Sequence, residues 1–460
     1  MSPTDVCVAS TATLDNWVRG VEERTAHIGI VGLGYVGLPL SLLFSEERFR
    51  VTGFDVDDSK VEKLNFGESY MYRIGREEIG AARDHGFRAT SNFVEIGELD
   101  AVLICVPTPL HDDHSPDMSY VVSTIEAIAP YLRPGQLVVL ESTTYPGTTT
   151  EIIVETINRL SGAEVLVDQG DGAAHPSAEL DGIMVAFSPE REDPGNVVTP
   201  RREIPKVVGG VDGRASAAAA ALYGAVFEKT VAMSSPAAAE MTKLLENIYR
   251  CVNIALVNEM KQLCLEMGID IWEVIAAAST KPFGFQAFYP GPGVGGHCIP
   301  VDPFYLTWKA QQFGFKTRFI ELAGEVNEEM PRFVVETTRR ALDRQGTDLA
   351  GARILILGVA YKRDVDDLRE SPALRIIDLL RDRGAEVLYN DPFLPVVGSG
   401  RKYDLQMHSV PLDYLDQYDA VVILTDHSVY DFADIVDRSR LVVDSRNATR
   451  LLNSEKIVRC

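Results

Sequence analysis

The chain reads His27-Ile-Gly-Ile-Val-Gly32-Leu-Gly34-Tyr-Val-Gly37 close to its beginning, and an apolar helical pattern follows directly. A short buried strand therefore runs through a glycine-rich turn into a helix. The three glycines have the G-x-G-x-x-G spacing in which a backbone turn approaches a pyrophosphate and a helix N-terminus offers oriented N–H groups. This pattern predicts a dinucleotide-binding α/β domain with loop contacts from Gly32, Gly34, Tyr35, Val36 and Gly37.

An acidic residue ends the next strand pattern, Val51-Thr-Gly-Phe-Asp55. Asp55 follows Gly32 at close to the separation of about 20 residues expected of a carboxylate that hydrogen-bonds a ribose diol. A carboxylate at this place also repels a 2′-phosphate. The sequence therefore predicts NAD rather than NADP as the cofactor.

Three further strand patterns, at residues 101–105, 137–140 and 184–187, each end in polar residues. Thr108, Thr143 and Glu190 follow these strands in turn. Each residue alone fits a turn or capping role equally well. Because ligands bind at the carboxyl ends of parallel strands, we interpret the three together as candidate site residues.

Residues 236–267 have an alanine-rich pattern with helical apolar spacing, and Gly268 is a natural stop. Lys243, Asn247 and Arg250 fall on one stripe of this predicted helix. Such a stripe is either a solvated edge or part of a binding site, and the helix alone does not distinguish the two.

A single cysteine stands in the stretch Gly291-Pro-Gly-Val-Gly-Gly-His-Cys298-Ile-Pro-Val-Asp302-Pro. This density of glycine and proline excludes a regular helix or a central strand. A thiolate held on such a loop can attack a bound substrate, and Asp302 is near enough in sequence to tune it or a water. The plainer alternative is a tight turn around an inert buried cysteine. The neighbouring motifs favour the nucleophile.

A second group of strand patterns occupies residues 353–358, 386–389, 420–424 and 441–444. The turn Gly358-Val-Ala-Tyr361-Lys362 lacks the second and third glycines of the fingerprint, so this half is expected to bind something other than a second dinucleotide. Cations at or just beyond these strands favour anion binding over a merely solvated surface, namely Lys362, Arg363, Arg369 and Arg446.

The patterns together predict two Rossmann-like α/β domains with parallel sheets, joined by a central all-helical dimerisation region. Shorter helices at 271–278 and 320–342, the second bent or broken at Pro331, complete that region. The expected segments are a leader at 1–26 with a short helix near Trp17, a cofactor domain at 27–215, a helical domain with the cysteine loop at 216–345, and a second Rossmann-like domain at 346–460.

Composition argues against several classes of protein. The net charge of −23 disfavours nucleic acid and anionic membranes as partners, and no apolar run reaches the length of a membrane span. Six cysteines without paired spacing argue against a disulfide framework and a zinc site, and no metal site is expected. Because residues 1–26 lack the order of a signal peptide, we expect a cytoplasmic protein.

These motifs resemble those of the UDP-sugar 6-dehydrogenases, over residues 27–447. The resemblance lies in the glycine turn and in Val106-Pro-Thr-Pro109, Ser188-Pro-Glu190, Glu240-Met-Thr-Lys243-Leu-Leu-Glu-Asn247, Gly295-Gly-His-Cys298, Tyr361-Lys362 and Asp444-Ser-Arg446. It implies NAD as the cofactor, a UDP-sugar as the substrate and oxidation of the sugar C6 to a uronic acid. It also implies a homodimer or a larger homo-oligomer.

The resemblance further implies roles for single residues. Cys298 would be the nucleophile, and Lys243, Asn247 and Asp302 would surround it. Thr143 and Glu190 would position water and transfer protons. The cofactor would also contact Thr108, Thr143 and Arg369. Substrate contacts would come from Glu190, Arg191, Lys243, Asn247, Phe288, Tyr289, Gly295, Tyr361, Lys362 and Arg446.

The chemistry of the family explains the cysteine. Conversion of an alcohol to an acid needs two hydride transfers, and a thiolate can trap the aldehyde between them as a thiohemiacetal that becomes a thioester. The forms Ser188-Pro-Glu-Arg-Glu-Asp-Pro-Gly195 and Gly295-Gly-His-Cys-Ile-Pro-Val-Asp-Pro303 look like the branch that acts on N-acetylhexosamines.

Within that branch, residues 141–147 and 281–285 are most similar to UDP-N-acetylglucosamine 6-dehydrogenases. The expected substrate is therefore UDP-N-acetyl-D-glucosamine, for surface polysaccharide precursors. UDP-N-acetyl-D-mannosamine is the alternative, and UDP-glucose is less favoured. A dehydrogenase of the β-hydroxyacid or 6-phosphogluconate type needs neither the cysteine loop nor the second α/β domain. A non-catalytic nucleotide-sugar sensor would not need Cys298, Lys243, Asn247 and Asp302.

Overall fold

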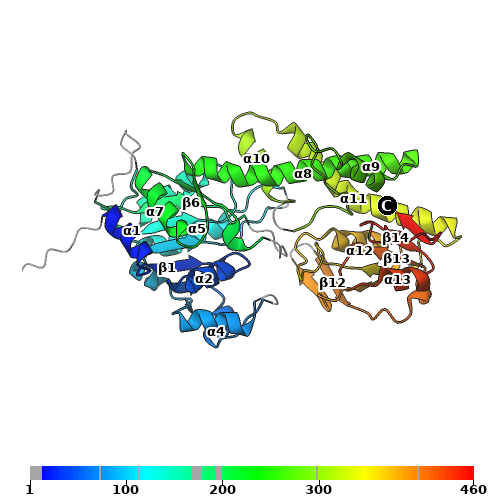
Figure 1. Cartoon of the computed structure of the whole chain (residues 1–460), viewed down its shortest axis with the longest axis horizontal. Helices are drawn as coiled ribbons and strands as arrows, with labels where there is room; N and C mark the ends of the chain where they lie inside the picture. Colours follow the sequence, from blue (N-terminus) through cyan, green and yellow to red (C-terminus); the bar gives the residue numbers. More distant parts are fainter. Residues whose placement is uncertain are drawn as a thin grey trace, which may run out of the picture. The chain divides into compact units, whose positions relative to one another are not determined.

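The structure is a computed structural model that describes residues 13–71, 74–111, 113–167, 179–191, 199–296, 299–400 and 403–460 (Figure 1). The chain forms two compact units, Met1–Leu245 and Glu246–Cys460. Each unit has a mainly parallel sheet and its own hydrophobic core. The predicted fold class, α/β with parallel sheets, is therefore confirmed.

The first unit is built on an eight-stranded sheet with the order β3-β2-β1-β4-β5-β6-β7-β8. β1 to β6 run parallel, whereas β7 is antiparallel to β6 and parallel to β8. The strand order reverses between β1 and β4, which is where ligands bind in open parallel sheets. The strands are β1 (His27–Val31), β2 (Arg50–Phe54), β3 (Arg88–Thr90), β4 (Ala101–Ile104), β5 (Leu137–Leu140), β6 (Met184–Phe187), β7 (Lys206–Gly210) and β8 (Thr230–Ala232).

Helices cover both faces of this sheet, because side chains alternate along each strand and both faces are apolar. Leu103 of β4 lies in one core, and its neighbours Val102 and Ile104 lie in the other. The first core includes residues of α1 (Leu14–Glu22), α2 (Gly37–Glu46), α3 (Asp58–Asn65), α4 (Arg76–Asp84) and α7 (Gly213–Gly224). The second includes residues of η1 (Phe93–Glu98), α5 (Ser119–Ile128), η3 (Thr149–Val154) and α6 (Glu155–Leu160), and η2 (Ala129–Tyr131) follows α5 directly.

The first unit extends beyond both of its predicted boundaries. The helix predicted near Trp17 is confirmed as α1, but it packs against α7 with Leu14 buried, so residues 14–26 are not a separate leader (Figure 1). The predicted boundary at 215 falls inside α7, and β8 continues the sheet to Ala232 within the region predicted to be all-helical. The sequence does not predict β7 and β8. β8 is short, and β7 contains a lysine and two glycines, which are poor strand formers.

A five-stranded parallel sheet, in the order β10-β9-β13-β14-β15, forms the core of the second unit. The strands are β9 (Arg353–Leu357), β10 (Glu386–Asn390), β13 (Ala420–Ile423), β14 (Val442–Asp444) and β15 (Ile457–Arg459), beside a hairpin of β11 (Val396–Gly400) and β12 (Tyr403–His408). One core includes residues of α12 (Pro372–Asp382) and the end of α11 (Arg318–Arg344), and the other includes residues of η5 (Leu415–Gln417) and α13 (Phe432–Arg438). The four strand patterns predicted for this half are confirmed.

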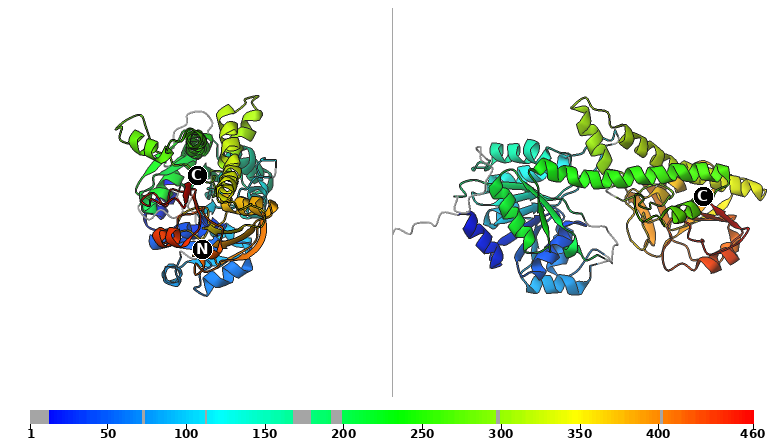
Figure 2. Two further views of the ribbon diagram at one scale, coloured as in Figure 1. Left: turned by 90° about the vertical axis from the view of Figure 1, so that its right-hand side faces the viewer. Right: turned by 45° about the horizontal axis from the view of Figure 1, so that its top comes forward.

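Two long helices confirm the predicted periodicity. α8 (Pro236–Met267) has the predicted bounds and is unbroken, as Figure 2 shows, and α9 (Ile271–Ala278) also has its predicted bounds. The helix predicted from 320 to 342 is not broken at Pro331, because α11 continues through the proline and the buried residues Met330 and Val334 maintain its packing on both sides. Across the described ranges, no helix combines the length and apolar character needed to cross a bilayer.

Candidate active site

The glycine-rich turn after β1 lies at the strand-order reversal and is fastened to Asp55. Gly32 has a φ of +92°, and a Cβ there would lie 2.8 Å from the Cys105 carbonyl oxygen, so only glycine fits. A Cβ on Gly34 would meet no atom within 4 Å, which leaves the backbone open to a pyrophosphate. Asp55, just after β2, accepts a hydrogen bond from the Leu33 N–H at 3.0 Å. The turn and the acid thus form one structure that fits a dinucleotide.

The other predicted cofactor residues of this unit frame the same turn. Val36 caps α2 and Gly37 begins it, so the N-terminus of the helix faces the turn. The Tyr35 side chain is half exposed, whereas Thr108 is buried in the segment after β4. Their positions fit the predicted roles, and their contacts with a cofactor stay a prediction.

Three predicted catalytic residues of the first unit form a buried group. Thr143 follows β5, Glu190 follows β6, and Lys243 lies on α8. The Lys243 ammonium donates a hydrogen bond to Thr143 Oγ1. Burial opposes ionisation of Glu190, but the positive charges of Lys206, Arg201 and Lys243 outweigh burial and lower its pKa. The solvated-edge interpretation of Lys243 is therefore wrong, since its side chain is buried.

Arg191, a predicted substrate contact, makes two hydrogen bonds within the first unit. Its guanidinium donates to the Pro205 carbonyl oxygen at 2.7 Å, and its backbone N–H donates to Glu190 Oε1 at 3.0 Å. These contacts connect the end of β6 to the chain entering β7. A substrate contact by this side chain stays a prediction.

Sequence reasoning missed the buried partners of Glu190. Lys206, the first residue of β7, lies between Glu190 and Glu141, with its Nζ 3.1 Å and 2.7 Å from their carboxylate oxygens. Tyr223 donates a hydrogen bond to the second oxygen of Glu141. A lysine or glutamate at a strand end carries no sequence signal of burial, so only the fold reveals this cluster.

The second unit holds the predicted pair Asn247 and Asp302. The Asn247 amide donates to the Asp302 carboxylate, and Arg250 donates to the Asn247 oxygen. Asp302 is completely buried in the first turn of α10 (Asp302–Gln311), where the helix dipole favours a negative charge. Cys298 lies outside the described residues, so its predicted place beside Asp302 stays a prediction.

The loop before Cys298 packs tightly against the end of the second sheet. Gly291 donates its N–H to Asn258 on α8 at 2.9 Å, and a Cβ on Gly291 would lie 2.9 Å from an Arg446 nitrogen. A Cβ on Gly295 would lie 2.7 Å from the Tyr361 side chain. The loop therefore needs glycine at these positions, because other side chains lie too close to its backbone to leave room for a Cβ. The structure therefore places Tyr361 and Arg446 against the loop that contains Gly295.

The three predicted anion-binding arginines have intramolecular partners, and Arg363 Nη1 lies 3.3 Å from an Asp426 carboxylate oxygen. Arg369 pairs with Asp367, its Nη2 2.7 Å from a carboxylate oxygen. Arg446 is half-buried and donates from Nε to the Leu424 carbonyl oxygen at 2.8 Å. The Lys362 side chain is half-buried. Their contacts with a ligand stay a prediction.

A buried Asp391–His427 pair supports the loop that carries Lys362. Asp391 accepts from the Val359 and Ala360 N–H groups at 2.8 and 3.1 Å, in the position that Asp55 has in the first unit. His427 Nε2 lies 3.1 Å from Asp391, and its Nδ1 accepts from the Asp364 N–H. Sequence reasoning missed both residues, although the acid after β10 repeats the acid after β2.

The predicted sugar-phosphate loop, Phe288 and Tyr289, lies against α8 and α9. Phe288 packs edge-on against Tyr249 with ring centroids 5.5 Å apart, and Tyr289 stacks on Trp272 at 5.9 Å. Tyr289 is nevertheless largely exposed. These aromatic contacts fix the loop, while its role over a substrate stays a prediction.

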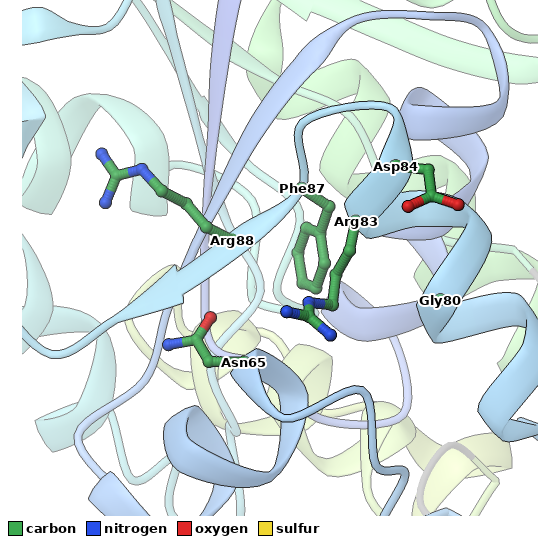
Figure 3. A pocket seen from close by; sticks show the side chains of 6 residues that line it. All are labelled: Asn65, Gly80, Arg83, Asp84, Phe87 and Arg88. Carbon is green, nitrogen blue, oxygen red and sulfur yellow. The ribbon is translucent and has the colours of Figure 1, made fainter.

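A surface hollow of the first unit, of about 450 Å³, contains none of the predicted residues. It is lined by Asn65, Gly80, Arg83, Asp84, Phe87 and Arg88. Figure 3 shows that the guanidinium groups of Arg83 and Arg88 point away from each other, and Arg88 pairs with Glu95. The two cations therefore do not converge on one ligand.

Comparison with known proteins identifies similarity over most of the chain. Residues 26–227, 237–329 and 355–451 match the NAD-binding, central and UDP-binding domains of the UDP-glucose/GDP-mannose dehydrogenase family. The chain is 36% identical over 420 residues to a UDP-N-acetyl-D-mannosamine dehydrogenase of Escherichia coli K12, which covers 88% of this chain and 94% of the relative.

Two other relatives have a similar extent. An NDP-N-acetyl-D-galactosaminuronic acid dehydrogenase of Ralstonia solanacearum is 34% identical over 436 residues, which covers 93% of this chain and 97% of the relative. The solved structure of a UDP-D-ManNAc dehydrogenase from Pyrococcus horikoshii superposes with a TM-score of 0.82 at 30% identity, covering 94% of this chain and 98% of the other. The similarity therefore includes both sheets and the helices between them in sequence.

Proposed function

The chain belongs to the UDP-glucose/GDP-mannose dehydrogenase family and is an NAD-dependent UDP-sugar dehydrogenase, and from this we propose that it oxidises C6 of a UDP-N-acetylhexosamine to a carboxylate. The observation that carries the proposal is Asp302, a fully buried carboxylate bonded to Asn247 shortly after Cys298 in the chain. A buried carboxylate is costly unless it is paired. Its position shortly after a cysteine in the sequence supports a role in proton transfer at a thioester.

The reaction proceeds through Cys298. NAD⁺, when bound, accepts a hydride in each of two successive oxidations. The Cys298 thiolate adds to the carbonyl carbon of the aldehyde formed first, and the resulting thiohemiacetal loses a hydride to become a thioester. Water then attacks the thioester carbon, the C–S bond breaks, and the acid and the thiolate are released. Glu190 or Asp302 accepts the proton from this water.

Three further polar residues are proposed to stabilise charge and position the water. Lys243 and Asn247 donate hydrogen bonds to the oxyanions that form on the sugar. Thr143, which is bonded to Lys243, positions the attacking water. The burial of all three side chains supports these roles, because buried donors need no reorganisation when charge develops.

The two nucleotides are held by different units. The first unit binds NAD through the Gly32–Gly37 turn, Asp55 and Thr108. In the second unit Tyr361, Lys362 and Arg446 hold the UDP group, and Gly295, Phe288 and Tyr289 contact the sugar phosphates. The tight packing of Gly291 and Gly295 against Arg446 and Tyr361 supports a shared role for loop and sheet end.

The relatives favour the mannosamine alternative over the glucosamine substrate predicted from residues 141–147 and 281–285. Both the Escherichia coli relative and the Pyrococcus horikoshii structure are UDP-N-acetylmannosamine dehydrogenases by name. We therefore propose UDP-N-acetyl-D-mannosamine as the preferred sugar nucleotide. The motifs used in the sequence analysis distinguish the N-acetylhexosamine branch from UDP-glucose enzymes but separate the C2 epimers poorly.

A substrate panel tests this choice. Purified protein with NAD⁺ is assayed by NADH absorbance against the UDP forms of N-acetylmannosamine, N-acetylglucosamine, N-acetylgalactosamine and glucose. The mannosamine form is expected to give the highest kcat/KM. A higher value for another N-acetylhexosamine corrects the epimer only, whereas preference for UDP-glucose refutes the N-acetylhexosamine assignment. No NADH with any of the four refutes the proposed function.

We further propose a homo-oligomer that assembles through α8 and works in the cytoplasm. The support for assembly is a stripe of exposed apolar side chains along one helix, at the helical spacing of an unburied face. The stripe consists of Met241, Leu245, Tyr249, Leu256, Met260, Leu263 and Met267. A second copy of this helix would cover such a face by like-with-like packing.

A further inference from the structure

The buried ammonium of Lys206 lies between two carboxylates of the first unit. Its Nζ is 2.7 Å from Glu141 Oε2 and 3.1 Å from Glu190 Oε2, and its side chain is 3% exposed. Glu141 follows β5, Glu190 follows β6, and Lys206 begins β7. Three neighbouring strands of the sheet therefore contribute one charge each to a single buried cluster.

The cluster is enclosed by aromatic side chains from the α7 region. The rings of Tyr223 and Phe227 lie 5.0 and 5.4 Å from Lys206 Nζ, and Tyr223 donates its hydroxyl hydrogen to Glu141. Burying three charges is costly, and well-packed apolar side chains often stabilise a fold as much or more. Stability alone is therefore a poor explanation for this cluster.

We propose that Lys206 and Glu141 are positioning residues that keep Glu190 ionised and oriented beside Thr143 and Lys243. This inference rests on the proposed function and, of the two proton acceptors named there, assigns the base to Glu190. Lys206 supplies the positive charge that a buried base requires. Glu141 accepts a second hydrogen bond from the same ammonium, and its negative charge limits how strongly Lys206 favours the charged form of Glu190.

The charges around Glu190 support this division. Burial disfavours its ionised form, but Lys206 from β7, Arg201 from η4 (Arg201–Glu203) and Lys243 from α8 outweigh burial and lower its pKa. Glu141 has the opposite balance, because burial, together with the negative charge of Glu190, raises its pKa despite Lys206. Two carboxylates that share one ammonium are thus held at different proton affinities, as acid–base sites require.

The inference predicts opposite effects of two substitutions on the plot of log kcat/KM against pH. The effects concern its acidic limb, where the rate falls because the base becomes protonated. Lys206→Met removes the cation and should move the limb to higher pH by roughly one unit or more. At pH values where the base is mostly protonated, kcat/KM should then be at least about tenfold lower than in the wild type. Glu141→Gln removes a competing negative charge and should move the limb to lower pH. Lys206→Arg keeps the charge and should keep the limb within a few tenths of the wild-type position.

A purely structural role gives another result. Both variants would then lose activity equally at all pH values, with the limb unmoved, and that outcome overturns the inference. Affinity for NAD⁺, measured by fluorescence titration, reports whether the first unit has folded in each variant. If Lys206→Met does not fold, Tyr223→Phe is measured in its place. Loss of the hydroxyl donor makes the ionised form of Glu141 less favourable, so the limb should move to lower pH, as in Glu141→Gln. An unmoved limb in Tyr223→Phe then overturns the inference.

The Glu190→Gln variant separates this inference from the proposed function. If the acidic limb persists unchanged in Glu190→Gln, Glu190 is not the titrating base, and its proposed role fails together with the inference. If the limb is lost in Glu190→Gln but does not move in the Lys206 and Glu141 variants, only the inference fails.

Discussion

His27 is a titratable residue whose burial makes the first unit sensitive to acid. It begins β1, and its Nε2 lies 2.9 Å from Thr52 Oγ1. Burial, reinforced by Arg50 and Arg88, lowers its pKa from 6.5 to about 4. The folded state therefore keeps the imidazole neutral where the unfolded chain already binds a proton, so stability is full above pH 6.5 and is lost as the pH falls toward 4.

Replacement of His27 should remove that loss. Between pH 7.5 and pH 4.5, His27→Gln is expected to lose less unfolding free energy than the wild type, by up to about 3 kcal/mol. Urea unfolding at several pH values measures the difference. His408→Gln is the matched control at an exposed histidine. Parallel pH dependence of His27→Gln and the wild type would show that His27 does not titrate as described.

In the proposed mechanism, Cys298 carries the difference between a two-electron and a four-electron oxidation. Cys298→Ser should lower steady-state acid formation by at least about 10²-fold, because a serine hydroxyl lacking its own base is a far weaker nucleophile than a thiolate. Affinity for NAD⁺ should be unchanged, since the glycine turn belongs to the first unit. Cys7→Ser is the control and should retain wild-type turnover. Normal acid production by Cys298→Ser would remove this residue from the mechanism.

α8 is secured near its N-terminus by Glu240, whose buried carboxylate accepts three hydrogen bonds. The donors are the Gly147 N–H at 2.6 Å and the N–H and hydroxyl of Thr149 at 2.9 and 2.7 Å. Glu240→Ala leaves these donors without their partner and is expected to cost about 2–4 kcal/mol of unfolding free energy. Glu259→Ala, an exposed site on the same helix, should change stability by less than about 0.5 kcal/mol. Equal effects in calorimetry would contradict the anchoring role.

The helices and strands show what the periodicity of apolar residues can and cannot predict. Strands β1 and β2 and the helices α8 and α9 have strong local patterns, and they form where the sequence predicts them. α11 continues through Pro331 because tertiary packing compensates for a lost backbone hydrogen bond, which no local pattern reveals. The partners of Glu240 are more than 90 positions away in sequence, so their contact depends on the completed fold.

The candidate site shows the same limit. Thr143, Glu190 and Lys243 were predicted from strand ends and motif resemblance, and the structure gathers them in the first unit. Lys206 and Glu141 were missed because their pairing joins residues 65 positions apart. Asn247 and Asp302 were singled out from a helix stripe and from the cysteine loop, but their grouping, across 55 positions of sequence, was predicted only through the family resemblance.

At the scale of the whole molecule, the exposed stripe of α8 predicts self-association. The double variant Leu256→Glu and Leu263→Glu places charges on that stripe and should shift the protein toward monomer in analytical ultracentrifugation. Leu451→Glu is the control, because Leu451 is also exposed but lies outside α8. A double variant with the wild-type sedimentation coefficient would place the interface elsewhere.

The count of NADH per sugar nucleotide tests the account most directly. Complete conversion of a limiting amount of UDP-N-acetyl-D-mannosamine, with NAD⁺ in excess, is expected to yield about two NADH and one uronic acid product per sugar. A yield of about one, with an aldehyde as the accumulated product, would contradict the thioester route through Cys298.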